Sequence, residues 1–104
     1  MKQQPTPYIG IDEDRYAGMT SKGKLIRDAW VFGLIDETQT CKGWLPQGLE
    51  DLHHKVNDEW DKYGCLVSSL PPELRERHER IHAEAIKKAR ELGWSGELET
   101  DDEG

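Results

Sequence analysis

The sequence predicts an α+β domain in which about three helices pack with a small sheet of short strands. Three segments carry apolar residues at helical spacing, and two short stretches, 8–11 and 38–44, favour extended structure. The chain has 104 residues, which is the usual length of one domain. We therefore predict a single compact domain over 1–94, of which 1–7 is a loose N-terminus. An all-α three-helix domain is the alternative.

The first predicted helix follows Thr20, whose hydroxyl suits the N-cap position. Apolar residues within 21–35 fall on one face of a helix, and Gly33 suits its C-terminal end. The run 30–35 is also compatible with a buried strand, because a short apolar run rich in aromatic and branched side chains fits both structures. We prefer the helix.

The second and third predicted helices have clearer periodicity. Over 47–63 the apolar residues recur every three or four positions, and Gly64 suits the end of that helix. The third helix is predicted over 72–92, where Pro72 suits the first turn and a continuous apolar stripe includes His78. Opposite charges also pair at i and i+4 along this helix, which favours an exposed helical surface.

The formal net charge of −7 lies mostly near the C-terminus. Residues 20–94 contain 12 Lys and Arg against 13 Asp and Glu, whereas 95–104 contain acidic residues and no basic one. We predict that 95–104 is a disordered acidic tail. The nearly neutral body lacks the basic surface that nucleic acids require, so nucleic-acid binding is disfavoured.

The cellular location is predicted from apolar runs and cysteines. No run resembles a signal peptide or reaches the roughly 18 apolar residues of a membrane span. We expect a cytoplasmic protein with no membrane partner, whose two cysteines, Cys41 and Cys65, are thiols. Both are expected to serve as small buried hydrophobic residues.

The string HERIH, residues 78–82, matches the H-E-x-x-H pattern of zinc peptidases. On a helix, His78 and His82 lie one turn apart on one face, as two ligands of one ion must, and Glu79 would polarise the bound water. Two features oppose this interpretation: Arg80 stands where that family has uncharged residues, and no downstream His or Glu supplies a third ligand. A zinc-dependent hydrolase using His78, Glu79 and His82 is therefore an alternative function.

A second zinc pattern combines Cys65, His78 and His82 with the spacing C-x12-H-x3-H. Cys41 would have to supply the fourth ligand from much earlier in the chain. Such a Cys2His2 site would be closed and structural, and it would stabilise a thin core without catalysing a reaction.

The favoured interpretation of the histidines involves no metal. His78 lies within the apolar stripe of the third helix and His82 at its edge, so both suit hydrogen-bonded positions at the boundary of the core. A buried neutral His78 would make the fold sensitive to acid, because unfolding lets the imidazole take up a proton. We accordingly assign no catalytic residue, no cofactor and no metal ligand. Zinc binding is the alternative, with the candidate ligands His78, His82, Cys65 and Cys41.

The chain contains two segments, GMTSKGKLIRDAWVFGLIDETQTCKGW and LPPELRERHERIHAEAIKKARELGW, that resemble a family of small proteobacterial proteins with no established function. Together these segments span about half of the chain. The resemblance implies a bacterial cytoplasmic protein with a mixed α+β domain. It implies no activity, cofactor or site residue.

The lack of a convergent catalytic set favours a small interaction or regulatory protein without catalytic activity. Exposed aromatic residues often mark partner sites, and Trp44 and Trp94 lie outside the helical stripes. We therefore predict these two tryptophans as contact residues for a protein partner or for self-association. A nucleic-acid-binding regulator is a further alternative, because Lys22, Lys24 and Arg27 lie close together on the first helix.

Overall fold

The structure, a computed structural model, describes residues 6–94. It contains three α-helices: α1 (Ser21–Val31), α2 (Pro46–Asp61) and α3 (Pro72–Glu91). Two short 3-10 turns precede α1, η1 (Ile11–Glu13) and η2 (Arg15–Ala17), and a third, η3 (Val67–Ser69), joins α2 to α3. The predicted tail, 95–104, and most of the predicted loose N-terminus lie outside the described residues.

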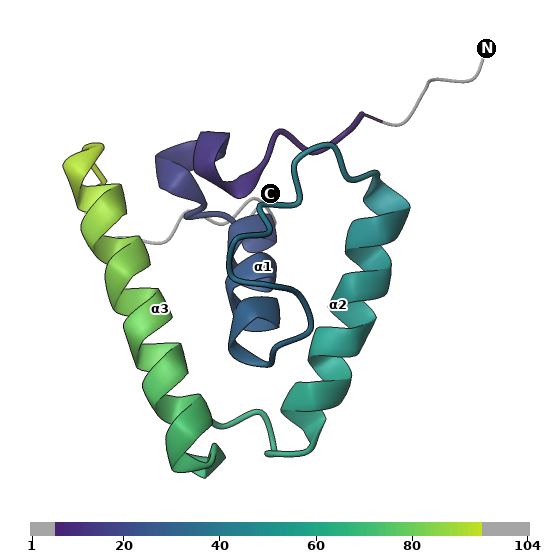
Figure 1. The fold of residues 1–104 in the computed structure, drawn as a ribbon, viewed down its shortest axis with the longest axis vertical. Helices are drawn as coiled ribbons and strands as arrows, with labels where there is room; N and C mark the ends of the chain where they lie inside the picture. Colours follow the sequence, from purple (N-terminus) through teal and green to yellow (C-terminus); the bar gives the residue numbers. More distant parts are fainter. Residues whose placement is uncertain (1–5, 95–104) are drawn as a thin grey trace.

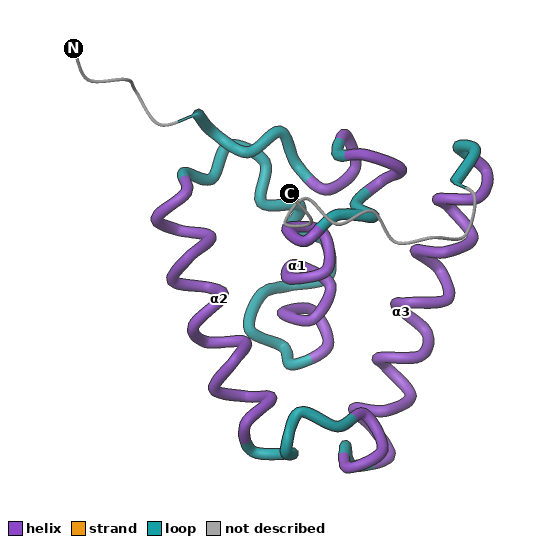
Figure 2. Tube along the Cα trace, turned by 180° about the vertical axis from the view of Figure 1, so that it is seen from behind, coloured by secondary structure: helices purple, strands orange, loops and turns teal. Residues whose placement is uncertain are grey.

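The three helices form a single assembly around α1. Figure 1 shows α1 at the centre, with α2 and α3 on either side of it, and α1 packs against both. Over residues 6–94 the chain forms helices, turns and loops and no strand (Figure 2). The α+β prediction is therefore wrong for the described residues, which form the all-α three-helix arrangement.

The two stretches predicted to be strands run beside each other without forming a sheet. The Tyr8 N–H donates to the Trp44 carbonyl at 2.7 Å, and the Gly43 N–H donates to the Tyr8 carbonyl at 2.8 Å. Gly10 and Cys41 have positive φ angles of 101° and 62°, which interrupt the extended backbone on both sides. Because a ladder needs consecutive extended residues, these hydrogen bonds stay isolated.

The helix predictions are confirmed, with ends that lie within two residues of those expected. The Thr20 hydroxyl accepts a hydrogen bond from the Gly23 N–H at 3.1 Å and caps α1. None of the helices within 6–94 is both long and apolar enough to cross a membrane. After α1 ends at Val31, the chain turns through Gly33, whose φ is 71°. Within the run 30–35 only the first two residues are helical and 32–35 form a turn, so the preferred helix is correct in part and the strand alternative is wrong.

The core lies between α1, α2 and the segment that precedes α1. Its buried side chains are Tyr8, Ile11, Ile26, Ala29, Cys41, Leu49, Leu52 and Val56. On the other side of α1 lies α3 (Figure 1), whose only buried residues are Ile81 and Ala89. The helix α3 therefore contributes two buried apolar side chains, and polar side chains occupy part of its boundary with α1.

Candidate metal centre

Three side chains that can ligate a metal ion meet between α1 and α3. Asp28 comes from α1, and His78 and His82 lie one turn apart on α3. Each of the three residues offers one ligand atom, and these three atoms all lie within 4.8 Å of one another. We call the three residues the ligand group. Because α1 and α3 pack directly against each other, the two helices hold the group together.

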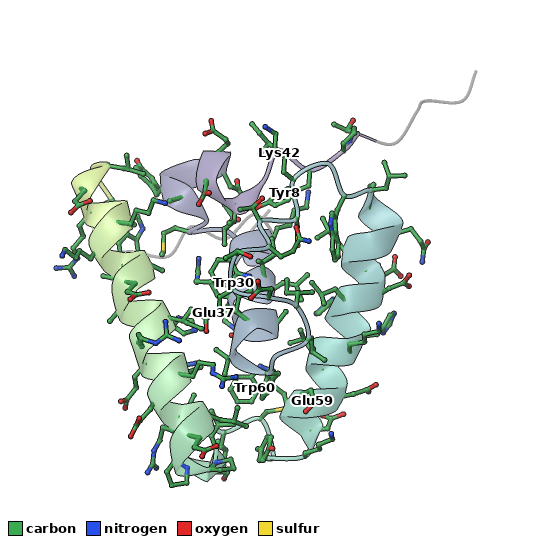
Figure 3. All side chains as sticks on the ribbon, in the orientation of Figure 1. Tyr8, Trp30, Glu37, Lys42, Glu59 and Trp60 are labelled. Atoms are coloured by element: carbon green, nitrogen blue, oxygen red, sulfur yellow. The ribbon has the colours of Figure 1, made fainter. Side chains whose placement is uncertain are left out.

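The Asp28 carboxylate is buried, with a side chain that is 4% exposed. Its Oδ2 atom accepts hydrogen bonds from Lys24 Nζ at 3.2 Å and from Trp60 Nε1 at 3.3 Å. Trp60 reaches this position from α2, in the lower part of Figure 3. The Oδ1 atom is buried and accepts no hydrogen bond from any described residue. An unpaired buried acceptor costs about 1–3 kcal/mol or more when charged, so this oxygen needs a proton donor or a cation.

His82 lies opposite that unpaired oxygen. Its Nε2 atom is 3.6 Å from Asp28 Oδ1, which is too long for a hydrogen bond. This nitrogen is also buried and without a hydrogen-bond partner among residues 6–94. The His78 ring lies beside the His82 ring, with centroids 4.1 Å apart, and the Trp60 ring meets His78 edge to face at 6.1 Å. The two unpaired atoms can be satisfied by a shared proton or by an ion between them.

The electrostatics of the cluster favour metal ligation. Burial opposes ionisation of Asp28, but the nearby His82, Lys24 and Trp60 outweigh it and hold the pKa of this carboxyl below its usual range. Burial lowers the pKa of His78, and the approach of His82 lowers it further. An ionised carboxylate and a neutral imidazole are the forms that bind metal ions.

The donor set indicates the class of ion. Two imidazole nitrogens and one carboxylate oxygen suit zinc, and the same set also holds iron(II) in other proteins. Ligands placed tetrahedrally about 2.0–2.1 Å from zinc lie about 3.3 Å apart. The His82–Asp28 separation of 3.6 Å is close to this value, and the wider separations in the group have to shorten by side-chain rotation. Three protein ligands leave one coordination position open.

The HERIH motif locates two members of the group and misses the third. His78 and His82 converge as the motif predicts, but Asp28 comes from a distant segment. Its only signal in the sequence is a carboxylate within the mostly apolar run 25–35, where a charge needs partners. The structure does not bring the cysteines of the alternative Cys2His2 site to the histidines: Cys41 lies in the core and Cys65 is exposed, and neither belongs to the group. Burial is thus confirmed for Cys41 and wrong for Cys65.

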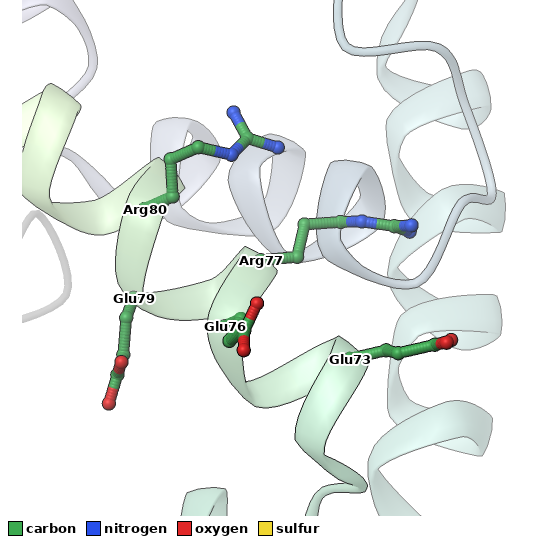
Figure 4. Close-up of a pocket in the computed structure, with 5 residues that line it drawn as sticks. All are labelled: Glu73, Glu76, Arg77, Glu79 and Arg80. Atoms are coloured by element: carbon green, nitrogen blue, oxygen red, sulfur yellow. The ribbon is translucent and has the colours of Figure 1, made fainter.

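Glu79, the predicted water-polarising residue, is exposed on α3. It lies in an open surface pocket lined by Glu73, Glu76, Arg77, Glu79 and Arg80 (Figure 4). Both arginines have partners elsewhere: Arg77 Nη1 donates to the Val31 carbonyl at 3.0 Å, and Arg80 pairs with Glu37 at 2.9 Å. Glu79 projects away from the two arginines (Figure 4) and is not part of the ligand group. The hydrogen bond of Arg77 attaches α3 to α1, and the ion pair of Arg80 attaches α3 to the loop that follows α1.

Trp44 and Trp94, the predicted contact residues, are both half-buried. Trp44 packs against the core, and the Trp94 N–H donates to the Ala89 carbonyl at 3.0 Å. The large apolar residues that are exposed are Ile9, Leu45, Leu66, Val67, Ile86 and Leu92. The contact role of Trp44 and Trp94 stays a prediction, and these six other side chains are more exposed.

Comparison with known proteins gives no relative from which a function could be transferred. No family model, no curated protein and no solved structure matches this chain. The resemblance to small proteobacterial proteins, and the bacterial origin that it implies, stay predictions. The function of the site has to be inferred from its geometry.

Proposed function

We propose that this protein binds a divalent transition metal ion, with zinc as the first candidate, through Asp28, His78 and His82. The proposal depends on the two buried, unpaired atoms Asp28 Oδ1 and His82 Nε2, which face each other at 3.6 Å. An ion between them gives both atoms a partner, and His78 completes a three-ligand site. A proton shared by Asp28 and His82 satisfies the same two atoms but gives no role to His78, so the third ligand favours the ion.

The proposed role of the ion is to fasten α3 to α1. The helix α3 buries only Ile81 and Ala89, and its further links include an exposed ion pair, Arg80 with Glu37, which water and salt screen. An ion that binds only the folded state stabilises that state, and the stabilisation grows as the concentration of free ion rises above the Kd. We infer a regulatory protein without catalytic activity, in which metal binding holds α3 in place.

We also propose a cytoplasmic location. Cys41 and Cys65 are both free thiols, which suits a reducing compartment. Isolation of the protein from its native host with a disulfide between these two residues would contradict this location.

Hydrolysis is a weaker interpretation of the same site. A zinc hydrolase needs a general base within reach of the bound water, and Glu79 is exposed and outside the ligand group. Substitution Glu79→Gln is therefore expected to leave the affinity for zinc unchanged and to abolish no hydrolytic activity.

Calorimetric titration of metal-free protein, purified without an affinity tag, tests the proposal. We expect one zinc ion per chain. The variants Asp28→Asn and His82→Gln should each lose more than about tenfold in affinity, because even outer partners of a metal site contribute 10–100-fold. His54→Gln removes an exposed imidazole from α2 and is the matched control, which should bind zinc as the wild type does.

Circular dichroism establishes first that each variant is folded. Zinc should then raise the Tm of the wild type, with a stabilisation of about 2.7 kcal/mol when free zinc is 100 times the Kd. The proposal is overturned if folded wild-type protein takes up no zinc, or if Asp28→Asn takes it up as tightly as the wild type.

Partner binding is the second candidate function. Leu66 and Val67, near the turn between α2 and α3, are 56% and 39% exposed, and neighbouring exposed apolar side chains favour contact with another protein. We expect self-association through this turn, seen in light scattering as a mass that rises with concentration and is reduced to the monomer by Leu66→Ser. A monomeric mass at every concentration would exclude self-association.

A further inference from the structure

We propose that the ion bound by Asp28, His78 and His82 takes a small oxyanion, a carboxylate or a phosphate, as its fourth ligand, and that Lys24 holds this anion. The inference rests on the metal site proposed above and adds the class of its fourth ligand. Because three protein ligands leave one tetrahedral position open, the groups around the site determine what fills that position.

The charges at the site favour an anion over water. Lys24 Nζ lies 3.2 Å from Asp28 Oδ2, and this ion pair is neutral as a whole. A divalent ion bound to the other oxygen, Oδ1, adds two positive charges close to the ammonium group. The two histidines are neutral donors when they ligate. The resulting excess of positive charge is reduced by a negatively charged fourth ligand.

Lys24 has two alternatives once an ion is bound. Its side chain is 53% exposed, so the ammonium group can move into solvent and lose its contact with Asp28. If the ion carries an anion, that anion accepts charge-assisted hydrogen bonds from the ammonium group and keeps it in place. Lys24 therefore opposes binding of the bare ion and favours binding of the ion with its anion.

A cavity beside the cluster has room for such an anion. It has a volume of about 200 Å³ and lies between α1 and α2. Asp28 is the member of the ligand group that lines this cavity, and Lys24 and Trp60, which both donate to Asp28 Oδ2, line it as well. The remaining polar lining consists of a hydroxyl, an imidazole and an amide, from Ser21, His53 and Asn57. Apart from Asp28, the polar lining thus offers hydrogen-bond donors, which suit an oxyanion.

Cobalt(II) in place of zinc tests the inference, because its visible absorbance changes with its inner ligands. Cobalt-loaded protein is titrated with acetate and, in a separate arm, with inorganic phosphate. We expect a saturable change in absorbance. Coupling between two ligands is reciprocal, so an anion that binds to the cobalt-loaded site also raises the affinity for cobalt. We expect an increase of about tenfold at saturating anion. The arm with the larger effect distinguishes carboxylate from phosphate.

Lys24→Gln is the diagnostic variant. Without anion it should bind cobalt at least as tightly as the wild type, because a neighbouring positive charge is removed, and it should lose the tenfold effect of the anion. Lys55→Gln removes the same charge from an exposed position on α2 and should respond to anions as the wild type does.

The outcomes separate this inference from the metal site itself. If cobalt and zinc do not bind at all, the metal site is wrong, and the inference falls with it. If cobalt binds but neither anion changes its absorbance, the metal site stands and the inference is overturned. An anion effect of equal size in Lys24→Gln and in the wild type overturns the role of Lys24.

Discussion

Three polar side chains are buried in α1 and at its cap: Thr20, Arg27 and Asp28. Each has partners in a different part of the molecule. Thr20 caps α1, Arg27 Nη1 donates to the Gly18 carbonyl at 2.6 Å, and Asp28 faces Trp60 of α2 and the two histidines of α3. Because a buried polar group is costly unless it is paired, these residues help to specify which segments pack against α1.

Metal-free protein is expected to lose stability as the pH falls from 7 toward 5. Burial lowers the pKa of His78 in the folded state. Below the unfolded value of about 6.5, the unfolded chain therefore binds more protons than the folded chain, and acid favours unfolding. The charged groups that act on this imidazole are His82 and Glu79 from α3 and Asp28 and Lys24 from α1. Asp28, whose pKa is also lowered, adds to the loss only below about pH 4, where carboxylates of the unfolded chain become protonated.

Urea unfolding at a series of pH values measures this dependence. His78→Gln should flatten the slope of stability between pH 7 and about 5, and His54→Gln, which removes an exposed imidazole, should leave the slope unchanged. A stability that does not vary over this range would show that His78 is not held neutral by its surroundings.

The start of α1 packs closely on the turn that precedes it. A β-carbon at Gly23 would overlap the carbonyl of Gly18, and Arg27, one turn further along α1, donates to that same carbonyl. The start of α1 is therefore joined to η2 by a contact that only glycine allows.

Gly23→Ala and Gly48→Ala are expected to change stability with opposite signs. Alanine in a helix is usually about 0.5–1 kcal/mol more stable than glycine. A β-carbon at Gly48, in α2, meets only Trp44 Cε3 at 3.5 Å, an ordinary contact, so Gly48→Ala should stabilise the protein by up to that amount. Gly23→Ala should destabilise it by about 1–3 kcal/mol, because η2 or α1 must shift. Paired urea unfolding curves measure both effects, and a stabilised Gly23→Ala would contradict the close packing.

The whole molecule is asymmetric about α1. On one side α2 buries Leu49, Leu52 and Val56, whereas on the other side α3 buries only Ile81 and Ala89. In Figure 1 the two outer helices diverge from the turn that joins them, with α1 between them. Since a segment with less buried apolar surface opens at a lower free energy, α3 should be the first helix to detach.

Hydrogen exchange of the metal-free protein should show less protection for α3 than for α1 and α2. Zinc should raise the protection of α3 toward that of α1, because the proposed ion joins Asp28 of α1 to both histidines of α3. Magnesium, which prefers oxygen ligands, is the control and should have no effect. Equal protection of the three helices without metal would contradict the weak attachment of α3, and no response to zinc would contradict the metal link.

Local patterns in the sequence were sufficient for the three helices and for the pairing of the two histidines. Apolar spacing, the Thr20 cap and Pro72 are local signals, because each acts on residues within a few positions of it along the chain. Helical geometry alone therefore turns each signal into structure. The same geometry places His78 and His82 one turn apart, whatever the rest of the chain does.

Two features depend on contacts between distant segments: the absence of a sheet over residues 6–94 and the third member of the proposed ligand group. The stretches around Tyr8 and Cys41 favour strands locally, but both pack into the core, and positive φ angles at Gly10 and Cys41 end the extended backbone there. Asp28 meets the histidines only because α3 packs against α1. No spacing along one chain segment encodes the distance between two helices, which is set by the side chains that pack between them.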